Sequence, residues 1–225
     1  MFRKDFIPEL DGLRGIAVLM VLWVHLPMDS LGETIEGLRQ AVVPGGVGVD
    51  LFFVLSGFLI TRILLVDREQ GRSLRNFLIR RFLRIFPIYY LLLAILAAWM
   101  SWEEIVACAT YTSNYLFLFK SRTSLLEHTW SLAVEEHFYL LWPPVVVFLR
   151  PLVSRRVLLL GVLPLSALTC LAALQFGDWG QDGQVLRQFL GRGSTSRFGS
   201  LGLGALLAYH EGFRARRCSW SKHSV

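Results

Sequence analysis

An arginine and a histidine are spaced so that they share one face of the first apolar segment. Arg14 and His25 are eleven residues apart, which on an α-helix is three full turns plus about 20° and about 16 Å of axis. Their side chains cannot touch each other, but they could contact the two ends of one elongated ligand. The spacing also fits a buried histidine that hydrogen-bonds a neighbouring helix, with Arg14 snorkelling to the membrane interface.

Two adjacent carboxylates form a second candidate cluster. Glu135 and Glu136 precede an aromatic, apolar run that begins at Phe138. Ser131 comes one helical turn before Glu135, so its hydroxyl and that carboxylate share a face. Such a carboxylate could orient a histidine or act as a base itself. The alternative is an interfacial pair that marks the end of a span, with neighbouring tryptophan and tyrosine as belt residues.

Three arginines stand just before an apolar run. Arg80, Arg81 and Arg84 precede Pro87, and Arg80 and Arg84 are one helical turn apart. Guanidinium groups bind phosphate in a bidentate manner. Anchoring on the cytoplasmic side and contact with anionic lipid head groups explain the same pattern.

One aspartate follows a glycine-rich turn. Gly45, Gly46 and Gly48 permit a tight turn and close helix approach before Asp50, which could pair with an arginine or help to line the site. The glycines match no phosphate-binding fingerprint. Three scattered cysteines and three histidines without metal spacing indicate neither a zinc site nor a disulfide framework; they are Cys108, Cys170, Cys218, His128, His137 and His210.

The composition indicates that these groups lie in a membrane protein. Of 225 residues, 54% are hydrophobic and only 18% are charged, against about 25% charged residues in a soluble domain. The net charge is +6, and the segment Thr61–Phe86 holds seven arginines against two carboxylates. By the positive-inside rule this segment and the N-terminus are cytoplasmic. Basic residues that flank membrane spans also argue against a nucleic-acid partner and for the lipid bilayer.

The apolar stretches predict an all-α, polytopic bundle of about six to seven transmembrane helices in the cell membrane. Ile105–Phe119 is short for a span. If it crosses the membrane, the later arginine clusters fall outside; if it does not, they return to the cytoplasmic side, which charge counting favours. The stretches are Gly12–Met28, Ala41–Thr61, Ile85–Trp102, Ile105–Phe119, His128–Leu149, Val157–Gly177 and Phe198–His210.

Five ordered blocks of sequence resemble the membrane acyltransferase 3 family. The chain opens with F-I-P-E-L-D-G-L-R-G-I-A-V from Phe6 and continues through Arg14-x10-His25. The later blocks are G-G-V-G-V-D-L-F-F-V-L-S-G-F-L-I at 45–60, R-R-F-L-R-I-F-P at 80–87, T-W-S-L-A-V-E-E-H-F-Y at 129–139, and T-S-R-F from Thr195.

The resemblance implies an integral-membrane O-acyltransferase without a tightly bound cofactor. Such an enzyme takes an acyl group, often acetyl, from a coenzyme A donor on the cytoplasmic side and transfers it to a hydroxyl of a cell-surface or exported carbohydrate. His25 matches the family's catalytic histidine, as general base or transient acyl carrier, and Glu135 could orient it. The residues that match or line the donor and substrate side are Arg14, Asp50, Arg80, Arg81, Arg84 and Ser131.

The chain departs from the family pattern in two residues and in length. His137 stands where a glutamine is expected, and Gly199 where an aspartate is expected. Residues 1–212 are expected to be a partial, C-terminally truncated acyltransferase domain, followed by a polar, basic tail over 213–225. Missing helices or an additional subunit would then complete the bundle.

Two other functions are compatible with the sequence. A degenerate homologue would keep binding and act as a membrane interaction protein without turnover. A small proton-coupled transporter would use His25 and the Glu135–Glu136 pair as a proton relay.

Overall fold

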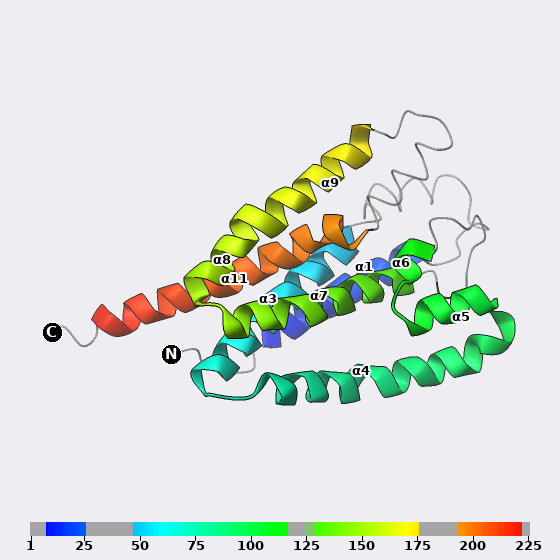
Figure 1. Cartoon of the computed structure of the whole chain (residues 1–225), viewed down its shortest axis with the longest axis horizontal. Coiled ribbons are helices and arrows are strands. Elements are labelled where there is room, and N and C mark those ends of the chain that lie inside the picture. The colour runs from blue at the N-terminus through cyan, green and yellow to red at the C-terminus, as the bar shows by residue number, and fades with distance from the viewer. Residues whose placement is uncertain (1–7, 26–46, 117–125, 127, 176–192, 222–225) are drawn as a thin grey trace.

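The computed structural model describes residues 8–25, 47–116, 126, 128–175 and 193–221, with the side chains of 24–25 and 213–221 outside that description. Every regular element among these residues is a helix (Figure 1). The elements are α1 (Pro8–His25), α3 (Val47–Glu69), α4 (Leu74–Leu96), η1 (Ala97–Trp99), α5 (Trp102–Ala109), α6 (Ser113–Leu116), α7 (Thr129–Phe148), α8 (Pro151–Val157), η2 (Leu158–Val162), α9 (Leu163–Gln175) and α11 (Ser194–Ser221).

Three of the described helical stretches are long and apolar enough to cross a membrane. They are Val47–Glu69, Leu74–Trp99 and Pro151–Gln175. The second and third expose most of their apolar side chains, for example Leu91 and Leu160, as helices do when lipid covers them. The all-α class is therefore confirmed for the described residues, and the count of six to seven spans stays a prediction.

The helices run in alternating directions, so that several helix ends that carry arginines lie at the same end of the bundle. Asp50 near the start of α3 pairs with Arg197 near the start of α11, and Arg62 pairs with Glu211 further along both helices. These two helices, and α7 with them, therefore run in the same direction, whereas α1, α4 and the α8–α9 rod run the opposite way (Figure 1). We call the end that holds the start of α4 and the ends of α3 and α7 the basic end, and the other the far end.

The short apolar stretch at 105–119 does not form one spanning helix in its described part. It is broken into α5, with eight residues, and α6, with four. Between them Tyr111 has a positive φ of 56°, which ends a helix and is uncommon for a residue other than glycine. A helical span needs about 20 residues. The chain therefore turns back at the far end, and Arg150, Arg155 and Arg156 lie at the basic end, as charge counting favours.

The core lies between α3, α7 and α11. Phe53, Phe138 and Leu201 are buried there, and the Trp142 indole donates a hydrogen bond of 2.8 Å to Thr61 Oγ1. Two glycines allow close contact: a Cβ on Gly57 would overlap the Leu201 backbone, and one on Gly204 would overlap the Val54 carbonyl. Small residues of this kind let the backbones of membrane helices approach closely.

The arginine-rich segment is helical rather than a loop between spans. α3 continues eight residues past Thr61, and α4 begins eleven residues before Ile85. Buried Asp67 pairs with Arg80 at 3.0 Å and with Arg72 at 3.4 Å. These pairs compensate the buried carboxylate. Neighbouring charges thus let both helices extend beyond their apolar parts.

Candidate active site

The first helix carries Arg14 and His25 on one continuous rod. α1 runs unbroken from Pro8 to His25, as the spacing argument requires. Arg14 is half-buried, and its Nε is buried without a hydrogen-bond partner among the described residues. His25 is the last residue of α1, and its side chain lies outside the described residues.

The start of α3 packs beside the second half of α1. A Cβ on Gly48 would meet Met20 Cβ at 2.9 Å and the Ala17 carbonyl oxygen at 3.2 Å. Gly48 thus allows α3 to lie close to α1, within about two turns of His25. Because the two helices are antiparallel, the start of α3 lies at the same far end of the bundle as the end of α1 (Figure 1). Asp50 is in the first turn of α3, and His25 is the last residue of α1.

Asp50 anchors a polar cluster at this far end. Its Oδ1 accepts hydrogen bonds from Arg197 at 3.1 Å and from Ser200 at 2.9 Å. The Arg197 guanidinium lies 5.6 Å from the centre of the Trp130 ring, a distance suited to cation–π attraction. Asp50 therefore pairs with an arginine. Arg197 was not among the predicted site residues, although it belongs to the T-S-R-F block that carried the resemblance.

Glu135 lies inside the bundle and contacts an arginine of α4. It is buried, it accepts a hydrogen bond from Tyr139, and its Oε1 is 3.6 Å from the Arg81 guanidinium. Arg81 also donates to Glu136 at 3.2 Å and stacks on the Tyr139 ring. The structure thus brings together Arg81, predicted on the donor side, and Glu135, predicted beside His25.

Ser131, Arg80 and Arg84 show no described hydrogen bond or ion pair with Arg81 or Glu135. Ser131 is on α7, where its hydroxyl donates to the His128 carbonyl at 3.0 Å. Arg80 is paired with Asp67, and Arg84 is exposed. Arg80 and Arg84 therefore present a mostly exposed face of α4 near the basic end, whereas Arg81 turns into the bundle. The three arginines do not converge on one point.

A serine–histidine pair was not predicted as a site. His137 Nδ1 is 2.7 Å from the hydroxyl of Ser194, the first residue of α11. Asn114 and Tyr115 of α6 also bond this hydroxyl, at 3.2 and 3.4 Å. The only signal in the sequence was that His137 stands where the family pattern has a glutamine. Nothing in the sequence indicates that Ser194 lies next to this histidine.

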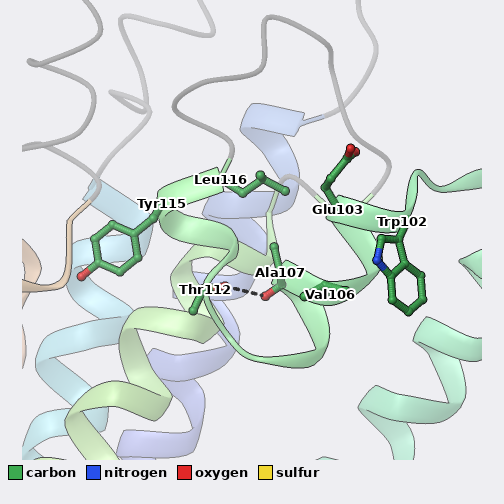
Figure 2. Close-up of a pocket in the computed structure, with 7 residues that line it drawn as sticks. All are labelled: Trp102, Glu103, Val106, Ala107, Thr112, Tyr115 and Leu116. Atoms are coloured by element: carbon green, nitrogen blue, oxygen red, sulfur yellow. Dashed lines mark hydrogen bonds between the residues drawn. The ribbon is translucent and has the colours of Figure 1, made fainter.

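A cavity of about 460 Å³ opens between α5 and α6 (Figure 2). Its lining is mostly apolar, and Figure 2 shows the Tyr115 ring at one side with its hydroxyl directed away from the other lining residues. Among the described residues, no group of histidine, cysteine or carboxylate side chains is arranged to hold a metal ion.

These features define a helical protein whose long apolar helices suit a membrane, with ion pairs and polar clusters between α3, α4, α7 and α11. The family model of the acyltransferase domain matches residues 7–220, so the chain belongs to this family of membrane proteins. The resemblance noted in the sequence is thereby confirmed. No solved structure matches the chain.

Bacterial relatives agree with this assignment. The chain is 34% identical to a peptidoglycan O-acetyltransferase of Listeria monocytogenes, over 75% of this chain and 29% of the relative. It is 32% identical to the "Putative peptidoglycan O-acetyltransferase YrhL" of Bacillus subtilis, over 85% of this chain and 31% of the relative. A "Putative O-acetyltransferase" of Staphylococcus aureus is 30% identical, over 92% and 35%. The chain spans about a third of the length of these relatives.

Proposed function

We propose that the protein transfers an acyl group, most simply acetyl, to a hydroxyl of a cell-wall carbohydrate of the peptidoglycan type. The family match over residues 7–220 carries this proposal. Two of the relatives described above bear names that specify both the acetyl group and the peptidoglycan acceptor.

The basic end suits an anionic donor, which we propose to be a coenzyme A thioester. The positive-inside rule assigns this end, and with it the N-terminus, to the cytoplasm. Arg14 is half-buried near the start of α1, and its buried Nε has no hydrogen-bond partner in the part of the chain that the structure describes; Arg80 and Arg84 lie on the exposed face of α4. Guanidinium groups bind phosphates well. A thin pantetheine arm could then follow α1 toward its far end.

The far end suits the acceptor. His25 ends α1 there and acts in this proposal as the general base on the carbohydrate hydroxyl. The Asp50–Arg197 pair and Ser200 supply polar groups at the same end. Since Glu135 contacts Arg81 and Tyr139, we assign it as a positioning residue that holds α4 against α7.

Membrane vesicles that contain the protein test this function directly. We expect radiolabelled acetyl groups to pass from acetyl-CoA to soluble peptidoglycan fragments as alkali-labile O-acetyl esters. Vesicles without the protein and fragments without free hydroxyls are the controls. Proton-coupled solute uptake without any O-acetyl product would contradict the proposal and favour a transporter.

Replacing Arg84 with alanine is expected to weaken donor binding by roughly three- to tenfold. The loss is modest because an exposed guanidinium–phosphate pair is screened by water. Titration of the solubilised protein with a non-hydrolysable acetyl-CoA analogue measures the affinity. Arg75→Ala, an exposed arginine nine residues earlier on α4 and so on the opposite face of the helix, is the matched control and should bind as the wild type does. Equal affinity of the Arg84 and Arg75 variants would remove Arg84 from the donor site.

A further inference from the structure

The hydrogen bonds around Ser194 direct its proton toward His137. The Asn114 amide nitrogen and the Tyr115 hydroxyl both donate to Ser194 Oγ, at 3.2 and 3.4 Å. These two bonds use the acceptor capacity of the serine oxygen. Its own proton is then free for the third neighbour, His137 Nδ1 at 2.7 Å.

The histidine is held in the orientation that a base requires. Its ring also interacts with the backbone of Tyr111, the residue with positive φ between α5 and α6, and it stacks on Tyr115 with ring centres 6.2 Å apart. A backbone carbonyl fixes the tautomer of a histidine by accepting the proton of one ring nitrogen, which leaves the other nitrogen as an acceptor. A serine within hydrogen-bond reach of a histidine oriented by a third group is the usual arrangement of an activated nucleophile.

The pair is buried near the polar cluster at the far end. Ser194 is 6% exposed, so bulk water is largely kept away from its hydroxyl. It begins α11 one turn before Arg197, the partner of Asp50 at the far end. Tyr115 lines the cavity between α5 and α6 with its ring, whereas its hydroxyl, which donates to Ser194, points away from the other lining residues (Figure 2).

We propose that Ser194 is a nucleophile that carries the acyl group between donor and acceptor, with His137 as its base. This inference rests on the proposed function. Ser194 Oγ attacks the thioester carbonyl while its proton moves to His137 Nδ1. The carbon–sulfur bond breaks, and the coenzyme A thiolate leaves with the proton from His137. The acceptor hydroxyl, deprotonated by His25, then attacks the Ser194 ester, and the released Ser194 oxygen takes up that proton.

Two kinds of labelling test the nucleophile in the full-length protein in membranes. An alkyl fluorophosphonate, which reacts with activated serines, is expected to label Ser194, and radiolabelled acetyl-CoA without acceptor is expected to leave an acetyl ester there. Peptide mapping locates both labels. Ser194→Ala should lose both, His137→Gln should react roughly 10²-fold more slowly, and Thr195→Ala, an exposed neighbour on the same turn, should react as the wild type does.

A further variant separates reactivity from folding. Ser194→Cys keeps a nucleophile, and its acetyl label should become a thioester that neutral hydroxylamine removes, whereas the wild-type ester resists this treatment. The proposal would be overturned if the fluorophosphonate failed to label Ser194. It would also be overturned if the Ser194→Ala protein transferred acetyl groups at the wild-type rate. Fluorophosphonate labelling of Ser194 without any acetyl transfer would instead contradict the proposed function and leave the nucleophile in place.

Discussion

Replacing Gly57 with alanine is expected to separate α3 from α11 and to destabilise the protein strongly. The added Cβ would overlap the backbone of Leu201. Unlike a side chain, a backbone carbonyl in the middle of a helix cannot move away by changing rotamer. Overpacking of a well-packed core costs about 1–3 kcal/mol and occasionally more. We therefore expect the unfolding midpoint in detergent to fall by roughly 5–10 °C, or the protein to aggregate.

Three variants make this prediction specific. Gly204→Ala should have a similar effect, because its Cβ would overlap the Val54 carbonyl across the same interface. Gly161→Ala is the matched control, since a Cβ at that glycine meets nothing within 4 Å and alanine favours helix. The midpoint is followed by tryptophan fluorescence and by size-exclusion chromatography after heating. Equal midpoints for Gly57→Ala and Gly161→Ala would show that α3 and α11 do not pack as described.

The sequence predicts where the helices lie better than where they end. The apolar stretch His128–Leu149 corresponds closely to α7, because its hydropathy changes sharply at both ends. Hydropathy misplaces the end of α3 and the start of α4, since both continue through the arginine-rich segment. Pairing between Asp67 and Arg80 stabilises those extensions, and hydropathy cannot detect it, because a hydropathy scale scores each charged residue as unfavourable whether or not it has a partner.

The same limit explains which parts of the site could be predicted. Asp50 and Glu135 stand out as charges in apolar sequence, and Arg81 belongs to a group of three arginines just before an apolar run, so all three could be chosen as candidates. Their partners depend on which helices pack together. Arg81 turns toward Glu135 because α4 lies against α7, and Asp50 meets Arg197 because α3 lies against α11, 147 residues later. The Ser194–His137 pair, 57 residues apart, is of the same kind.

Replacing His25 with alanine is expected to reduce acetyl transfer by roughly 10²- to 10⁴-fold, the usual contribution of a general base. The family motif places the histidine eleven residues after Arg14, on a helix that the structure shows to be continuous. It ends that helix at the far end, where Asp50 and Ser194 also lie. His210→Ala, an exposed histidine on α11, is the matched control and should retain full transfer.

The fate of the radiolabelled acetyl group distinguishes two roles of His25, general base and acyl carrier. If His25 deprotonates the acceptor and Ser194 carries the acyl group, the His25→Ala protein should still take radiolabelled acetyl from acetyl-CoA. The label should then accumulate on Ser194, because the step that removes it is slow. If His25 were itself the acyl carrier, the variant would take up no label at all. Wild-type transfer by His25→Ala at equal abundance in the membrane would exclude both roles, and the histidine would then serve only to pack the end of α1.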